Sequence, residues 1–324
     1  SYPPFEEPPM NVPSGFLRMA CLFAPIVFMF PVSMSAEETP SGKTVRLLTI
    51  GNSFSQNATQ FLGDLAKSTG DSLVLRGANV GGASLELHWS KAMAFEADPM
   101  DKQGRYVTGK SLKEELEGGL WDVVTIQQAS VKSHDVSTYR PFAKQLADYV
   151  RRHAPGTTLM IHQTWAYRVD SPRFRVTMPK EGEPRSQQEM YDGLSAAYRE
   201  IASELGIRRI PVGDAFFRAD TNPEWGYRVD SNFVIDGAVS PALPQQTHSL
   251  HVGWRWQKES STRQKLVMDA NHASIAGEYL GACVWYELLF AKPCAETTFV
   301  PKGLASDYAR FLRETAHAAV EAAK

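Results

Sequence analysis

The chain has 324 residues, of which 43% are hydrophobic and 22% are charged, and its net charge is −2. These values are those of a globular protein with enough residues for a sizeable core, in one large domain or two small ones. Lysines and arginines are spread along the chain without a basic block, which argues against nucleic acid as a partner.

The N-terminal segment has the layout of a secretory signal peptide. Residues 16–31 are apolar apart from Arg18 near their start, and small residues and then two glutamates at 37–38 follow. A charged start, an apolar middle and a small-residue cleavage region are typical of export signals. The alternative, a membrane anchor, is disfavoured because prolines interrupt the run, which is also shorter than a membrane span. We therefore assign residues 1–36 to upstream residues plus a signal peptide, and we expect a periplasmic or extracellular protein without a membrane partner after cleavage.

Strand patterns alternate with helix patterns along the rest of the chain. Apolar runs of strand length lie at 45–50, 72–76, 122–126, 158–162 and 209–212. Helical spacing lies at 58–69, 112–117, 139–153 and 187–205, and further helices at 273–289 and 304–323 close the chain. Such alternation predicts a parallel sheet of about five strands with helices on both faces, in a single α/β domain over residues 44–324.

A long insertion at about 220–268 does not follow this alternation, and we interpret it as a loop that is functional rather than disordered. It carries Trp225, Trp254 and Trp256, which either pack the insertion onto the domain or line a substrate cleft, where aromatic faces would stack on sugar rings. Cys283 and Cys294 remain after removal of the signal peptide and could pair, or could simply be small buried residues. No Cys/His cluster suggests a metal site.

Ser53 lies at the carboxyl end of the first predicted strand, directly before a predicted helix. Ligands of open α/β sheets bind at this edge, so Ser53 is a candidate nucleophile, with Ser55 as a rival that more naturally caps the following helix. A serine hydroxyl needs a base that is itself oriented by an acid. Asp269 and His272 supply both, three residues apart, at a predicted junction of loop and helix.

Residues 51–54 (Gly-Asn-Ser-Phe) and 269–272 (Asp-Ala-Asn-His) resemble the first and last sequence blocks of the SGNH (GDSL-type) hydrolase superfamily. The resemblance covers residues 44–324. It implies a flavodoxin-like, doubly wound three-layer α/β/α fold, esterase or lipase activity without a cofactor or metal, and a triad of Ser53 (nucleophile), His272 (base) and Asp269 (acid).

The same resemblance implies an oxyanion hole formed by Ser53, Gly82 and a residue of the third block. Gly82, with Gly81 as the alternative, follows the second strand. The third block departs from the superfamily, because a glutamine stands where an asparagine is expected. A glutamine amide offers the same N–H donor, so we assign this role to Gln127, with Gln128 as the alternative. The chain is similar to a less characterised branch with GNSFS, a third-block glutamine and a Gln-x-Trp at 163–165.

Further candidates for lining the substrate pocket are His88, Gln163, Trp165, Trp254 and Trp256, although a surface or packing role is favoured for His88. Together these features predict an exported serine esterase that hydrolyses acyl esters, above all acetyl esters, on carbohydrate through an acyl-enzyme. One alternative is a lipid or aryl esterase with the same triad. Another is a non-catalytic carbohydrate-binding protein on a hydrolase scaffold.

Overall fold

A computed structural model describes residues 42–261 and 263–324. The predicted upstream residues and signal peptide, 1–36, lie outside the described residues. The core of the described part is a five-stranded sheet in the order β2-β1-β3-β4-β5, in which every neighbouring pair is parallel. Its strands are β1 (Thr44–Gly51), β2 (Ser72–Asn79), β3 (Val123–Ile126), β4 (Thr158–His162) and β5 (Arg208–Ile210).

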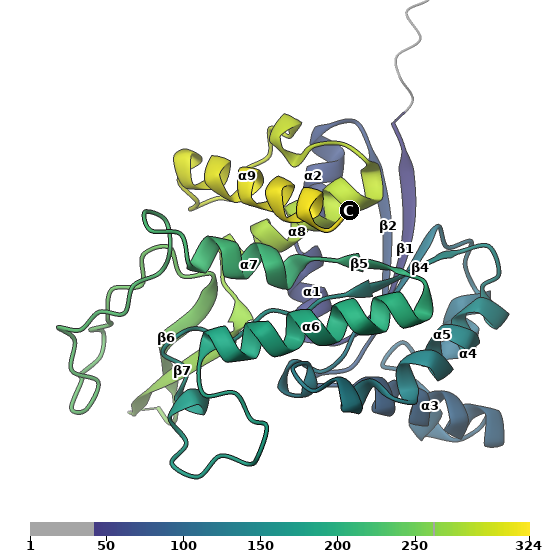
Figure 1. The fold of residues 1–324 in the computed structure, drawn as a ribbon, viewed down its shortest axis with the longest axis horizontal. Coiled ribbons are helices and arrows are strands. Elements are labelled where there is room, and N and C mark those ends of the chain that lie inside the picture. The colour runs from purple at the N-terminus through teal and green to yellow at the C-terminus, as the bar shows by residue number, and fades with distance from the viewer. Residues whose placement is uncertain (1–41, 262) are drawn as a thin grey trace, which may run out of the picture. The chain divides into compact units, whose positions relative to one another are not determined.

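Helices cover both faces of this sheet (Figure 1). On one face lie α1 (Ser53–Thr59), α2 (Leu62–Ser68) and α8 (Ile275–Phe290), with α7 (Val212–Asp220) and α9 (Ser306–Ala322) packed against α8. The other layer consists of α3 (Leu85–Ala97), α4 (Leu112–Glu117), α5 (Phe142–His153) and α6 (Gln187–Leu205). The predicted three-layer α/β/α fold with a doubly wound parallel sheet is therefore confirmed. None of the helices in 42–261 and 263–324 is long and apolar enough to cross a membrane.

The strands read as continuous apolar runs because both of their faces are covered. Leu47, Leu48 and Ile50 of β1 are all fully buried, although successive side chains of a strand point to opposite faces. Cys283 of α8 is also fully buried, and its thiol is free, as is that of Cys294. The two cysteines therefore form no disulfide in this structure.

Two helices were not predicted, and one predicted helix is divided. The range 58–69 covers the end of α1 and all of α2, and α1 already begins at Ser53 because the Asn52 side chain caps it. Helix α3 was missed because its buried face includes a histidine and a small alanine, which leave a weak apolar stripe. Helix α7 begins at Val212, where the sequence pattern had extended a strand.

The insertion contains a β-hairpin, so the prediction of a loop throughout 220–268 is wrong. Strands β6 (His251–Lys258) and β7 (Gln264–Ala273) pair antiparallel, with Gly253 opposite Asp269. Residues 221–250 form neither helix nor strand. Asp269 and His272 consequently lie on the last residues of a strand, and not at a junction of loop and helix. The alternation of polar and apolar residues in β6 was a usable strand signal.

Candidate active site

A tight turn between β1 and α1 presents Ser53 at the carboxyl edge of the sheet. Asn52 has extended backbone angles, and its Oδ1 accepts the Phe54 N–H at 2.9 Å, which starts the helix. A Cβ atom on Gly51 would approach the Ser55 Oγ to 2.4 Å and the Gln127 Oε1 to 2.8 Å. Glycine is thus required at position 51, because the chain passes directly over buried polar side chains.

The structure brings Ser53, His272 and Asp269 together. The Ser53 Oγ lies 3.0 Å from the His272 Nε2, and the His272 Nδ1 lies 3.0 and 3.1 Å from the two carboxylate oxygens of Asp269. The backbone N–H of His272 also donates to the Asp269 Oδ1 at 3.0 Å. A carboxylate accepts only, so the neutral imidazole carries its proton on Nδ1 and turns the lone pair of Nε2 toward the serine.

The electrostatics of this pair suit a general base. Burial raises the pKa of Asp269, but the hydrogen bonds from His272 outweigh it and bring the pKa to about 2. The hydrogen bond to Asp269 raises the pKa of His272, against the opposing effect of burial. Asp269 is therefore ionised at neutral pH, and His272 is made more basic by it.

Gln127 does not reach the position of an oxyanion donor in this structure. Its side chain is fully buried beneath the serine turn, where the Nε2 donates to the Asn52 Oδ1 at 2.6 Å and to the Gln128 carbonyl at 3.3 Å. Its Oε1 accepts from Ser55 and from the His162 Nδ1. Both amide hydrogens are thus occupied, and Ser55, the rival nucleophile, is buried in the same network.

The alternative donor, Gln128, is also occupied. Its Oε1 accepts from the backbone N–H groups of Leu85 and Ala129, and its Nε2 donates to the carbonyl and hydroxyl of Thr138. It therefore joins the start of α3 to the loop after β3. The two glutamines hold the walls of the site together through buried hydrogen bonds.

Gly82 lies in an exposed turn after β2. It is exposed and has a φ of +67°, in a turn closed by the Ala83 N–H on the Val80 carbonyl at 3.0 Å. The Asn52 Nδ2 donates to the Ala83 carbonyl at 3.0 Å, which ties this turn to the serine turn. Among the described residues, none accepts a hydrogen bond from the Gly82 N–H, so this donor is free.

Three residues predicted to line the pocket are buried supports instead. His88 is fully buried: its Nε2 donates to the Gly51 carbonyl at 3.0 Å, its Nδ1 accepts from Tyr106, and burial lowers its pKa to about 4. Gln163 exchanges hydrogen bonds with the side chain and backbone of Asp214 at the start of α7. Trp165 is fully buried as well.

Trp165 and Arg168 hold the strand that carries the acid and the base. The Trp165 Nε1 donates to the Asn271 carbonyl at 2.9 Å, and the Arg168 backbone N–H donates to the Ala270 carbonyl at 2.9 Å. The indole stacks on Phe216, with ring centroids 4.4 Å apart, and contacts Phe54 beside the serine at 4.3 Å. Arg168 was not foreseen from the sequence, because nothing in its Pro- and charge-rich surroundings indicates burial.

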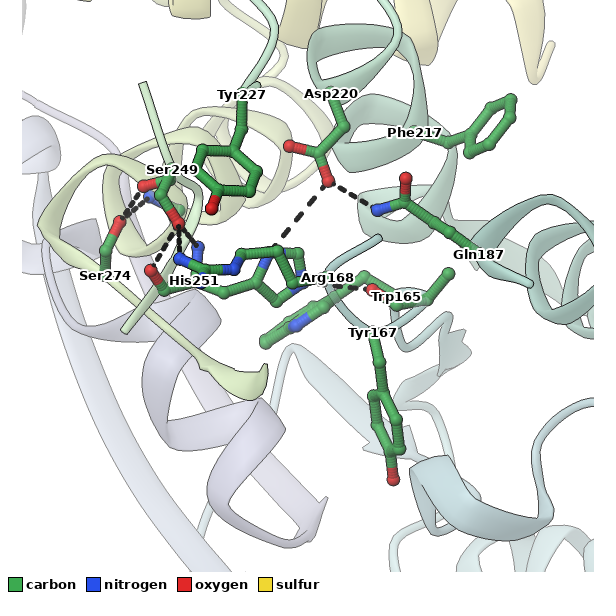
Figure 2. A network of polar contacts seen from close by, with 12 residues as sticks. Trp165, Tyr167, Arg168, Gln187, Phe217, Asp220, Tyr227, Ser249, His251 and Ser274 are labelled. Carbon is green, nitrogen blue, oxygen red and sulfur yellow. Dashed lines mark hydrogen bonds and ion pairs between the residues drawn. The ribbon is translucent and has the colours of Figure 1, made fainter. Parts of the chain in front are cut away.

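A buried polar network continues from this segment beneath the hairpin (Figure 2). The Arg168 guanidinium pairs with Asp170 at 2.7 and 2.9 Å, and the His251 Nε2 donates to the Ala166 carbonyl at 3.0 Å. Burial raises the pKa of Asp220 to about 7, and its carboxyl lies 3.9 Å from the His251 Nδ1. This network secures the start of β6, opposite the end of β7.

The remaining two predicted lining residues, Trp254 and Trp256, lie on the other face of the hairpin from the acid. Because Gly253 pairs with Asp269 and strand residues alternate, Arg255 shares the face of Asp269, and the two tryptophans do not. The Trp256 Nε1 donates to the Ala242 carbonyl at 2.9 Å, within the insertion. The structure therefore does not bring them to the triad.

The sequence profile of a family described as a domain of unknown function, DUF4886, matches residues 46–240, more than half of the chain. The chain belongs to this family. The crystal structure of a DUF4886 family protein from Bacteroides uniformis ATCC 8492 is similar to it, with 25% sequence identity and a TM-score of 0.64 over 86% of this chain and 95% of that chain. Among curated proteins, none matches this DUF4886 chain.

Two other solved structures resemble the DUF4886 chain more weakly. A protein from Slackia heliotrinireducens, described provisionally as an SGNH hydrolase, is 21% identical with a TM-score of 0.44 over 76% of this chain and 98% of that chain. Phospholipase A1 from Streptomyces albidoflavus NA297 is 12% identical with a TM-score of 0.39 over 76% of this chain and 99% of that chain. Proteins of the SGNH-hydrolase type are thus among the structural neighbours, a likeness that concerns the fold.

Proposed function

We propose that this protein is a serine esterase that hydrolyses acyl esters through an acyl-enzyme. The observation that carries the proposal is the continuous chain of contacts from the Ser53 Oγ to the His272 Nε2 and from the His272 Nδ1 to Asp269, each close to 3 Å. This arrangement assigns a nucleophile, a base and an orienting acid by geometry.

In the first step His272 takes the Ser53 proton while the Oγ forms a bond to the ester carbonyl carbon. Electrons from the carbonyl double bond move to its oxygen, which we assign to the N–H groups of Ser53 and Gly82. As the tetrahedral intermediate collapses, the alcohol leaves with the proton from His272. Water, deprotonated by the same imidazole, then releases the acid from the acyl-enzyme and restores the serine.

We further propose that the substrate is an acetylated carbohydrate and that the protein is exported to the periplasm or beyond the cell. Export is supported by the sequence layout of residues 1–36, and the choice of a polar substrate by the aromatic content of the insertion. A lipid or aryl ester would use the same triad. A comparison of p-nitrophenyl acetate with longer-chain esters, in solution and in micelles, separates these substrates.

The mechanism is tested by Ser53→Ala, with hydrolysis of p-nitrophenyl acetate as the readout. Loss of the nucleophile should lower kcat by roughly 10⁴-fold or more. Ser90→Ala, which removes an exposed hydroxyl on α3, serves as the control and should retain wild-type activity. Unchanged turnover in Ser53→Ala would contradict the proposal. Labelling of the wild type by a fluorophosphonate, absent in Ser53→Ala, would separate an enzyme from a non-catalytic binding protein.

A further inference from the structure

An open cavity of about 750 Å³ lies between the insertion and the first turns of α8 and α9. This volume is within the range of small-molecule sites. Its walls come from the insertion, the start of β6, the end of β7 and the first turns of α8 and α9. Ala273, the residue directly after His272, is part of the wall. The wall of the cavity thus includes the backbone neighbour of the predicted base, although the imidazole itself is not among the lining residues.

A second connection joins the cavity to the helix of the nucleophile. Asn57 lies one helical turn after Ser53 on α1, and so on the same side of that helix. Its Nδ2 donates to the Glu278 Oε1 at 3.1 Å, and its Oδ1 accepts the Ala273 N–H at 3.2 Å. Glu278 lines the cavity. Asn57 therefore links the wall of the cavity to the helix that carries Ser53.

One wall of the cavity is aromatic. Trp225 and Tyr308 stack with ring centroids 5.6 Å apart and an interplanar angle of 17°, and His248 lies 5.0 Å from Trp225 and 4.4 Å from Tyr308. His248 has a φ of 61°, which is rare for a residue other than glycine, and the Tyr308 hydroxyl donates to its carbonyl. Trp225 stays partly exposed, so it offers an aromatic surface to a ligand.

The polar groups of the cavity are acceptors rather than cations. Glu278 and Asp307 line it, and of the described lining residues none is Lys or Arg. Burial raises the pKa of Glu278, whose carboxyl group accepts a hydrogen bond from the neutral Asn57 amide. Such a lining repels phosphates and carboxylates, but it accepts hydrogen bonds from hydroxyl groups. The negative face of an aromatic ring attracts the weakly positive C–H face of a pyranose.

We propose that this cavity is a saccharide subsite that holds an uncharged sugar ring of the ester substrate while its acyl group reaches Ser53. The proposal rests on the proposed esterase function and deepens it, because it places the sugar on Trp225 and against Glu278. The aromatic surface proposed to contact the sugar is thus that of Trp225, and not that of Trp254 or Trp256 in the hairpin.

The test uses a variant that fills the cavity without removing a packed side chain. Thr247 is exposed and lines the cavity, so Thr247→Trp blocks it. Thr158, exposed at the start of β4 on the opposite edge of the sheet, gives the matched control Thr158→Trp. For each protein, kcat/KM is measured for removal of O-acetyl groups from O-acetylated xylo-oligosaccharides and from O-acetylated, fully N-acetylated chito-oligosaccharides. The same constant is measured on p-nitrophenyl acetate.

The expected result is that Thr247→Trp lowers the ratio of kcat/KM on the preferred oligosaccharide ester to that on p-nitrophenyl acetate by tenfold or more, while Thr158→Trp leaves the ratio unchanged. Trp225→Phe, which keeps an aromatic ring but reduces its face, should lower the ratio by a smaller factor. An unchanged ratio in Thr247→Trp overturns the subsite. A selective loss on p-nitrophenyl octanoate instead assigns the cavity to the acyl chain and also overturns it.

Binding supplies an independent measurement. Calorimetric titration of Ser53→Ala with unsubstituted xylohexaose and with fully N-acetylated chitohexaose, both uncharged, should show binding that the added Thr247→Trp substitution weakens at least tenfold. Absence of binding by either glycan at millimolar concentration overturns the subsite. The esterase proposal fails separately, when wild-type hydrolysis of p-nitrophenyl acetate does not depend on Ser53.

Discussion

The two halves of the candidate triad are held in different ways. Ser53 stands on a turn whose neighbour Asn52 is 2% exposed and hydrogen-bonded to three different segments. His272 and Asp269 stand on a hairpin strand, with side chains 39% and 19% exposed. Their strand is fixed from outside, through hydrogen bonds to its carbonyl groups from Trp165 and Arg168. The turn that carries the nucleophile is therefore anchored in the core by buried side chains. The strand that carries the base is held at the surface of the domain by hydrogen bonds to its backbone.

This difference predicts where each half is sensitive to substitution. On the serine side, a lost hydrogen bond leaves buried polar groups unpaired and lowers the stability of the whole domain. On the histidine side, a lost contact leaves the strand in place but loosens the base, so activity falls more than stability. The predictions below test this contrast.

The largest effect is expected for Asp269→Asn. An amide facing the His272 Nδ1 stabilises the tautomer with the proton on Nε2, so the lone pair no longer faces Ser53, and kcat should fall by roughly 10³- to 10⁴-fold. Because the side chain is partly exposed, the midpoint of thermal unfolding should change little. An equal loss of stability and activity would contradict the contrast. Asp269→Ala provides the control that separates loss of the charge from the wrong tautomer.

The pH dependence of kcat/KM measures the effect of Asp269 on the pKa of His272. His272 must be neutral to take the serine proton, and Asp269 raises the pKa of His272 above its ordinary value of 6.5. The rate should therefore rise with pH, with a midpoint above 6.5, and become constant at higher pH. In Asp269→Ala the raising hydrogen bond is absent, so the midpoint of the residual activity should move to lower pH. An unmoved midpoint would show that another group titrates.

The sequence predicted the serine half better than the histidine half for a physical reason. The strand, the glycine and the cap of Ser53 are consecutive residues, so local patterns contain the whole arrangement. The position of Asp269 and His272 depends on strand pairing with β6 and on Trp165, about a hundred residues away in sequence. Only the short spacing between the acid and the base was visible locally.

The same limit explains the oxyanion residues. The Gly82 turn is a local feature, in which the glycine is exposed and has a positive φ. Gln127 has the right chemistry for a donor, but its direction is decided by a contact across the sheet with Asn52. A sequence pattern specifies which side chain follows a strand. It does not specify with which of several buried groups that side chain forms its hydrogen bonds.

On the serine side, Asn52→Ala should lower the free energy of unfolding by about 2–4 kcal/mol. The substitution removes the cap of α1, and it takes away the partner of one Gln127 amide hydrogen and of the Ala83 carbonyl. Asn52→Asp keeps both acceptor roles but turns an oxygen toward the Ala83 carbonyl. Its free energy of unfolding should therefore lie between those of the wild type and Asn52→Ala. Chemical denaturation gives the free energy of unfolding of the three proteins. A loss below about 0.5 kcal/mol in Asn52→Ala would contradict a stabilising role of this residue in the serine turn.

The smallest and most selective effect is expected for Trp165→Phe, with Trp285→Phe as its control. Both tryptophans are fully buried, but the Trp165 Nε1 donates to the strand of His272, whereas the Trp285 Nε1 has no hydrogen-bond partner among the residues that the structure describes. Both substitutions should destabilise the protein by a similar amount, about 1–3 kcal/mol, through lost packing. Only Trp165→Phe should also lower kcat, by roughly tenfold, with KM unchanged, because the base then samples positions from which it cannot reach Ser53. A comparable fall in kcat for Trp285→Phe would mean that general loosening of the core, and not the bond to the Asn271 carbonyl, limits the reaction.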